Sequence, residues 1–192
     1  MNTYLEFEKP IEQLDNKVHE LKSLNDNAPS DNLLEEITQV EEQINETYRK
    51  IYSSISPWQR TLVARHPQRP KTREYIQNLI EDFFPLSGDR FFSEDKAILG
   101  GFGKFRGKTV LVLGHEKGHD TTSRIEHNFG MPRPEGYRKA QRLMKLAEDF
   151  DIPVISFVDT PGAYPGVGAE QRGQSEAIAK TTECCLSLGV PI

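Results

Sequence analysis

Residues 154–170, VISFVDTPGAYPGVGAE, hold the clearest structural pattern in the chain. Val154, Ile155, Phe157 and Val158 form a nearly continuous apolar run, which is typical of a strand covered on both faces. The prolines and glycines that follow predict a rigid loop at the carboxyl end of this strand. In open α/β sheets ligands bind at that edge, and small residues let a ligand approach the backbone closely. The segment therefore predicts an α/β fold with a candidate binding loop.

Helices are expected on both sides of this strand. One runs from Glu135 to Phe150, with Pro134 at its first position, and the other from about Glu170 to Leu188, with Gly189 ending it. The buried face of the first helix is predicted from its apolar residues at helical spacing, Tyr137, Ala140, Leu143, Met144, Ala147 and Phe150.

Two helix-to-strand junctions look alike. DIPVI at 151–155 and GVPI at 189–192 both read as the entry into a parallel strand. A natural domain seldom ends at such an entry, so we expect a chain that is truncated at its C-terminus.

Upstream segments predict further elements. We expect a helix over Thr72–Phe84, and two extended segments, 97–105 and 109–115, joined as a hairpin by Arg106-Gly107-Lys108. Trp58–Pro70 opens helically and is stopped by two prolines. Residues 116–133 have no clean period, which indicates a long functional or partner-facing loop.

The N-terminal segment predicts two antiparallel helices around a turn at 25–32. Apolar residues recur at three- and four-residue spacing in both, at Ile11, Leu14, Val18 and Leu21 and at Ile37, Val40, Ile44, Tyr48, Ile51 and Ile55. The seam of this hairpin needs a covering surface, either the body of the chain or a partner. We expect a helical hairpin over residues 1–56 and a second domain over 57–192.

Composition narrows the function classes. Residues 1–50 carry 12 acidic and 5 basic side chains, whereas the formal net charge of the whole chain is −5. This charge argues against non-specific binding of nucleic acid or anionic membranes. Cys184 and Cys185 are adjacent within a helical pattern and predict helix packing, neither a disulfide framework nor a zinc site. No signal peptide or membrane span is evident, so a cytoplasmic protein is expected.

One motif needs to be rejected. FVDTPG at 157–162 resembles the strand-end aspartate of nucleotide triphosphatases, and Gly107-Lys108-Thr109 resembles the end of a phosphate loop. That loop requires a glycine where this chain has Phe102. Thr109 also begins an apolar strand-like run, although a phosphate loop must open a helix whose amides hold the phosphate. The sequence therefore does not predict a GTPase.

Four segments together resemble one family: LVARHPQRP (62–70), SGDRFFSEDKAILGG (87–101), NFGMPRPEGYRKAQRLMKLAE (128–148) and FVDTPGAYPGVGAEQRGQSEAIA (157–179). They resemble the α subunit of the bacterial multi-subunit acetyl-CoA carboxylase carboxyltransferase over most of residues 57–192. The resemblance implies a crotonase-like ββα spiral, incomplete here, preceded by the helical hairpin.

The resemblance also implies a reaction and partners. Such an enzyme moves a carboxyl group from biotin, held on a biotin carboxyl carrier protein, to acetyl-CoA, giving malonyl-CoA for fatty-acid synthesis. A carboxyltransferase β subunit that carries zinc is the expected partner in an α2β2 assembly, with biotin carboxylase in the wider complex. The chemistry requires preorganised N–H donors for oxyanions and no nucleophilic serine or cysteine.

Site residues follow from the same resemblance. A biotin-pocket loop is implied at Gly162, Ala163, Tyr164, Pro165 and Gly166. We expect Asp159 to brace this loop by accepting backbone N–H bonds. Arg133, Arg138 and Lys139 are candidate contacts for CoA phosphates or the β subunit, against the alternative of a solvated charged face. His66 is expected in a capping or interface role rather than a catalytic one. His115, at a strand end, is only a weak candidate for a functional residue.

The glycine-rich turn that supplies the biotin oxyanion hole in this family is expected beyond Ile192. We therefore assign no catalytic residue within the 192 residues and expect the chain alone to be inactive. Two alternatives stay open: a non-catalytic assembly fragment of the complex, and another crotonase-like enzyme such as a hydratase or a biotin-dependent decarboxylase.

Overall fold

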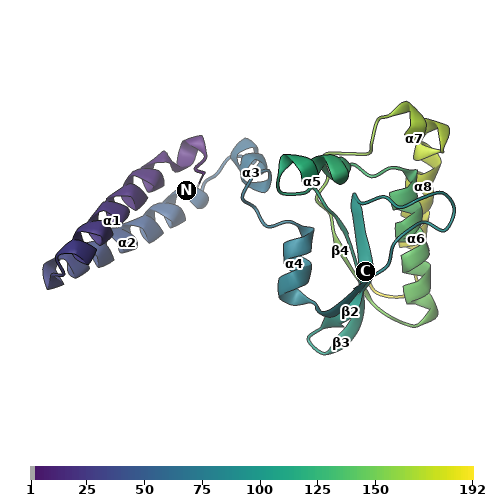
Figure 1. The fold of residues 1–192 in the computed structure, drawn as a ribbon, viewed down its shortest axis with the longest axis horizontal. Helices are drawn as coiled ribbons and strands as arrows, with labels where there is room; N and C mark the ends of the chain where they lie inside the picture. Colours follow the sequence, from purple (N-terminus) through teal and green to yellow (C-terminus); the bar gives the residue numbers. More distant parts are fainter. Residues whose placement is uncertain (1–2) are drawn as a thin grey trace. The chain divides into compact units, whose positions relative to one another are not determined.

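The computed structural model describes residues 3–192, which form two compact units (Figure 1). The first extends to Arg69 and is helical, and the second, from Pro70 to Ile192, is an α/β unit. The compact units thus divide between Arg69 and Pro70, later in the chain than residue 56. The functional domain division at residue 56 stays a prediction.

The helical unit is built on an antiparallel hairpin. After a short 3-10 turn, η1 (Glu6–Glu8), come α1 (Lys9–Asn27), α2 (Asp31–Tyr52) and α3 (Pro57–Ala64). The apolar seams of α1 and α2 pack on each other and bury Ile11, Val18, Leu21, Ile37, Val40 and Ile44. The predicted hairpin is therefore confirmed, and each helix covers the seam of the other.

The α/β unit contains a four-stranded sheet of order β1-β2-β3-β4. Its strands are β1 (Glu81–Pro85), β2 (Ile98–Phe105), β3 (Lys108–His115) and β4 (Val154–Phe157). The first three strands pair antiparallel, and β3 pairs parallel with β4. Arg106 and Gly107 form the β2–β3 turn, both at positive φ, which matches the right-handed twist of a hairpin.

Helices cover both faces of this sheet (Figure 1). On one face α4 (Thr72–Leu79) packs on Val110 and Val112. On the other, α6 (Pro134–Asp149) packs on Leu111 and Leu113, and α8 (Gln174–Ser187) packs mainly on α6 within the same core. The remaining helical elements are α5 (Thr121–Glu126), η2 (Asn128–Gly130) and α7 (Val167–Gln171).

Several predicted boundaries were wrong. The helix expected over 72–84 ends at Leu79, because Ile80 is extended and Phe83, Phe84 and Pro85 enter β1. Gly173 adopts a left-handed conformation and divides the helix expected over 170–188 into α7 and α8. The segment 116–133, expected to be a loop, contains α5 and η2.

Three residues assigned to buried faces are exposed. Tyr48, predicted on the seam of α2, is 37% exposed. Phe150 follows the end of α6 and is 67% exposed, and Val158 follows β4 and is 79% exposed. Residues 190–192 are not assigned as a strand. The carbonyl of Pro191 nevertheless accepts a hydrogen bond from the amide of Val154 (2.8 Å), as that of Pro153 does from Leu111 (2.9 Å). The two junctions are thus alike in structure as well as in sequence.

No helix described in residues 3–192 is both long enough and apolar enough to cross a lipid bilayer.

Candidate functional site

The candidate site is the loop between β4 and α7, residues 158–166. Thr160 holds its first half, because its hydroxyl donates to the carbonyl of Gly130 (2.6 Å) and accepts from the amide of Gly162 (3.0 Å). Gly162 has φ +147°, a conformation that side chains rarely adopt, and a Cβ atom there would meet nothing within 4 Å. The backbone at Gly162 is therefore held in place yet open to an approaching group.

Tyr164 is fixed from several sides. Its amide donates to the carbonyl of Pro132 (3.0 Å), and the guanidinium carbon of Arg133 lies 4.7 Å from its ring centroid. The buried side chain of Gln174 donates to the carbonyls of both Pro132 (2.9 Å) and Tyr164 (3.3 Å). A Cβ atom on Gly166 would collide with the Tyr164 ring. The ring is thus clamped between a cation and a backbone that tolerates only glycine.

Asp159 lies at the start of the loop and pairs with Lys117. The expected backbone N–H bonds to this carboxylate are not found among residues 3–192, so the brace through Asp159 is an ion pair between side chains. Gly130 makes the pair feasible, because a Cβ atom at Gly130 would lie 2.7 Å from the Lys117 side chain. Thr160, which the sequence did not single out, supplies the backbone brace instead.

The three candidate cations have different surroundings. Arg133 stacks on Tyr164 and donates to the side chain of Asn128 (3.0 Å). Arg138 is half-buried, donates to the carbonyl of Arg172 and lies over the ring of Phe91. Lys139 is 1% exposed and pairs with Glu94, so it contacts neither a solvated ligand nor solvent. The interpretation that these three residues form a solvated charged face is therefore wrong for Lys139.

A family model described as "Acetyl co-enzyme A carboxylase carboxyltransferase-like" matches residues 4–192. The chain belongs to this family. The resemblance that the sequence motifs indicated is thereby confirmed.

Similar proteins in this family come from several bacteria. The chain is 56% identical over 191 residues to the acetyl-coenzyme A carboxylase carboxyl transferase subunit alpha of Rhodopseudomonas palustris strain HaA2. It is 57% identical over 189 residues to the protein of the same name from Caulobacter vibrioides NA1000. The alignments cover 100% and 98% of this chain but 59% of each relative, so the chain spans about three-fifths of their length.

Solved carboxyltransferases share the fold. Transcarboxylase 12S matches with a TM-score of 0.52 and 20% identity, over 66% of this chain and 23% of that one. The geranyl-CoA carboxylase β subunit of P. aeruginosa matches with a TM-score of 0.51 and 20% identity, over 66% of this chain and 22% of that one. A single-chain long-chain acyl-CoA carboxylase matches with a TM-score of 0.53 and 23% identity, over 67% of this chain and 13% of that one. At these identities the match concerns fold alone, and it confirms the expected crotonase-like α/β class.

The start of α6 positions the family's PRPEG segment beneath the loop. Asp95 is buried and accepts hydrogen bonds from the amides of Ala97 (3.0 Å) and Arg133 (2.7 Å). Gly136 must lack a side chain, because a Cβ atom there would lie 2.6 Å from an Asp95 oxygen. Burial raises the pKa of Asp95, while the two amides and Lys139 oppose that shift. Asp95 thus sets the entry angle of α6 and the place of Arg133.

Sequence reasoning missed Asp95 and Glu135 and gave only a weak functional signal for Glu116, beside His115; all three are buried. Glu116 accepts the amides of Gly118 (2.9 Å) and Arg73 (3.0 Å), and Glu135 pairs with Arg172. The burial of Lys139 could have been predicted from the sequence. It lies three residues after Gly136 and four before Leu143, on the apolar stripe of α6. The carboxylates gave no such indication of burial, since their partners are distant in the sequence.

His115 lies where β3 ends beside β4. It lines an apolar cavity of about 190 Å³ together with Gly114, Phe157 and Val158. Burial lowers the pKa of His115, opposed by a hydrogen bond to the Phe157 backbone and by Asp159. Its Nδ1 atom is buried without a hydrogen-bond partner among the described residues. This position at the strand ends places His115 near the loop without giving it a reacting partner.

The other singled-out residues serve the scaffold. His66 belongs to the helical unit, where Nε2 donates to the carbonyl of Thr3 (2.6 Å) and Nδ1 accepts from the amide of Gln68 (3.2 Å). Cys184 is buried in the core, and the Cys185 sulfur lies 3.6 Å from that of Met144. Burial raises the pKa of both thiols, which disfavours the reactive thiolate.

The 158–166 loop combines open backbone with one fixed aromatic ring. The loop offers open backbone at Gly162 and small residues at Ala163 and Gly166, beside one clamped aromatic ring. Its nearest carboxylate, Asp159, is neutralised by Lys117. Such a surface can meet a ring by shape and by backbone hydrogen bonds, and the Thr160 hydroxyl is already bonded to the backbone of Gly130 and Gly162.

Proposed function

We propose that this chain serves as the α subunit of the carboxyltransferase component of acetyl-CoA carboxylase. In that reaction carboxybiotin on its carrier protein supplies the carboxyl group, and acetyl-CoA becomes malonyl-CoA for fatty-acid synthesis. The observation that carries the proposal is 55–58% identity, along the whole chain, to proteins named for this role. The shared crotonase-like fold supports it independently of sequence.

The proposed role of the loop is to receive biotin. Gly162, Ala163, Pro165 and Gly166 would line the approach, and Tyr164 would form a wall against the bicyclic ring. The fit rests on the open backbone at Gly162 and on the clamped Tyr164 ring. Asp159 would keep the loop in place through Lys117.

The partners form part of the proposal. A β subunit would supply most of the acetyl-CoA site and a structural zinc, in an α2β2 assembly that works in the cytoplasm with biotin carboxylase. Residues 3–192 contain no group of three or more His, Cys, Asp or Glu side chains arranged to hold a metal ion. Arg133 and Arg138 remain candidates for contacts with the β subunit or with CoA phosphates.

The test uses the subunit as its gene encodes it, assembled with the β subunit, and measures malonyl-CoA formation from carboxylated carrier protein. Avidin should block the activity, which separates the reaction from that of a hydratase. Sodium-coupled loss of CO2 from malonyl-CoA, by way of biotin, would instead identify a biotin-dependent decarboxylase.

A variant pair tests the loop. Gly162→Val should lower activity at least tenfold while assembly persists, because it adds a side chain where the backbone is open and φ is unfavourable. Gly107→Val is the matched control, since Gly107 also has a positive φ and open space but lies in the β2–β3 turn, at the opposite end of β3 from the loop. Equal activity of both variants would favour the alternative of an assembly scaffold.

A further inference from the structure

The loop between β1 and β2 has an unusually ordered tip, residues 87–93. One carboxylate oxygen of Asp89 accepts hydrogen bonds from three successive amides, those of Phe91 (3.0 Å), Phe92 (2.8 Å) and Ser93 (3.1 Å). Gly88 and Arg90 are held at positive φ on either side of Asp89. This arrangement presents Phe91 outward at 81% exposure on a fixed backbone.

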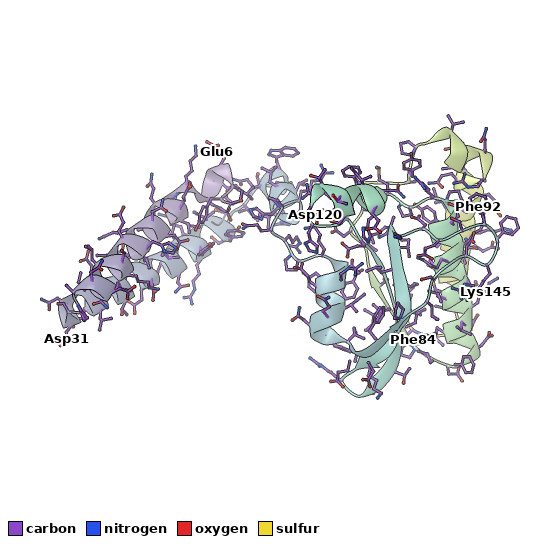
Figure 2. All side chains as sticks on the ribbon, viewed as in Figure 1. Glu6, Asp31, Phe84, Phe92, Asp120 and Lys145 are labelled. Carbon is purple, nitrogen blue, oxygen red and sulfur yellow. The ribbon has the colours of Figure 1, made fainter. Side chains whose placement is uncertain are left out.

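Helix α6 holds this tip from the other side. Arg142 donates to the carbonyls of Gly88 (2.9 Å) and Ser87 (3.2 Å). The guanidinium of Arg138 lies 5.2 Å from the Phe91 ring centroid, and its Nη1 is 3.9 Å from Asp89. Figure 2 shows Phe92, on the tip, and Lys145, on α6, on the same side of the unit. The exposed aromatic ring is therefore positioned before any ligand arrives.

A cleft of about 680 Å³ opens between this tip, α6 and α8, and we call it the basic cleft. Its lining includes five cations, Arg90, Arg138, Arg142, Lys145 and Lys180, but only two carboxylates, Asp89 and Glu176. None of the residues of the 158–166 loop lines it.

Most of this positive charge is not neutralised. Glu176 pairs with Lys180 (2.9 Å), and one carboxylate oxygen of Asp89 accepts hydrogen bonds from backbone amides. Within residues 3–192, Arg90 and Lys145 have no carboxylate partner. Burial, and then the neighbouring Arg90, lower the pKa of Arg142. Nη1 of Arg138 is buried without a hydrogen-bond partner in the described part of the chain.

We propose that the basic cleft binds an organic phosphate that carries a planar ring, the chemistry of a nucleotide. Guanidinium groups match phosphate oxygens in geometry and charge, and Arg90, Arg138 and Arg142 supply three of them. Phe91 supplies a face on which a planar base can stack, and the volume suits a ligand of this size. A free nucleotide here would go beyond the proposed function, whereas assignment to coenzyme A would rest on it, since Arg138 is also a candidate there for CoA phosphates. A free nucleotide and the nucleotide half of coenzyme A share this chemistry, and the experiment separates them.

Calorimetric titration of the purified chain tests the proposal with defined probes. ADP should bind, pyrophosphate should bind at least tenfold more weakly, and adenosine should give no measurable heat. The ADP affinity should fall as ionic strength rises, because the contacts are ionic. Coenzyme A binding tighter than ADP would assign the site to the acyl-CoA substrate, and the reverse would assign it to a free nucleotide. Absence of ADP binding at millimolar concentration overturns the proposal.

A pair of double variants controls for general charge. Arg90→Gln with Lys145→Gln should weaken ADP binding at least tenfold, because it removes the two cations without carboxylate partners. Arg106→Gln with Lys108→Gln removes the same charges at the β2–β3 turn and should leave binding within twofold. Arg106, like Arg90, has a positive φ, so the backbone consequences match. Equal losses in both double variants would contradict a defined site, and matching thermal melting curves confirm that both are folded.

Phe91→Leu isolates the stacking contribution. The phosphate contacts remain, so ADP affinity should fall to about that of pyrophosphate while pyrophosphate binding is unchanged. Unchanged ADP binding by Phe91→Leu would contradict the role of the ring and overturn the nucleotide assignment.

Discussion

Gly166 and Tyr164 are in such close contact that residue 166 has no room for a side chain. A Cβ atom at this position would lie 3.0 Å from Cζ of the Tyr164 ring and closer still to its Cε1. The backbone of Gly166 has φ −85°, so this glycine is required by space and not by conformation. The relationship sets the position of the only aromatic ring in the proposed biotin loop.

Gly166→Ala should displace the Tyr164 ring and lower carboxyltransferase activity at least tenfold, with a loss of about 1–3 kcal/mol in the free energy of unfolding from overpacking. Gly168→Ala is the control, because its Cβ would meet only the flexible end of Arg172, at 3.1 Å. Malonyl-CoA formation and urea unfolding measure the two effects. If both variants retain the same activity, the position of Tyr164 has no part in the reaction.

Lys139→Ala should destabilise the α/β unit by about 3 kcal/mol, because it removes one partner of a pair in which the lysine is fully buried. It also removes the Nζ donor to the carbonyl of Asp95 (2.8 Å), which then keeps only the longer bond from the amide of Ile98 (3.4 Å). Lys145→Ala makes the same change at an exposed position of the same helix and should stay within about 0.5 kcal/mol. Denaturant unfolding of the two variants measures this difference, and equal midpoints would show that the buried pair contributes nothing to stability.

The stability of the α/β unit should fall on mild acidification through His115. Because burial lowers the folded pKa below the ordinary 6.5, the unfolded chain binds the proton at higher pH than the folded chain does. The free energy of unfolding therefore rises with pH up to about 6.5, by at most about 1.4 kcal/mol per pH unit. His115→Gln should reduce this slope between pH 5 and 7. His119→Gln serves as the control for removing an exposed histidine, and an unchanged slope in His115→Gln would rule out this histidine as the source.

Ile11→Ala should destabilise the helical unit by about 2–5 kcal/mol, because Ile11 is fully buried in the seam between α1 and α2. Leu24→Ala, at a position 57% exposed on α1, should have little effect. Hydrogen exchange of the α1 and α2 amides reports on this unit separately from the sheet. Equal protection in both variants would mean that something other than the seam stabilises the hairpin.

Local pattern was enough for much of the fold. The β2–β3 hairpin, α6 beginning at Pro134, and the strand followed by the 158–166 loop were all predicted. Each depends on periodicity or on glycine and proline, which act within a few residues. The helix over 72–84 failed because the apolar spacing of Phe83 fits a helix, whereas pairing of Phe84 with Phe102 places this segment in the sheet. That pairing partner is distant in the sequence and leaves no local trace.

The sequence by itself determined the family, the hairpin seam and the 158–166 loop, since recurring apolar positions and a dense glycine–proline motif are local properties. Only the tertiary structure decided which charges are buried and what they meet. Lys139 pairs with Glu94, Glu135 pairs with Arg172, and the tip at 87–93 lies against α6 to form the basic cleft. A charged side chain is stable inside a protein only with a partner, and folding brings these partners together from positions 37 to 45 residues away in the chain.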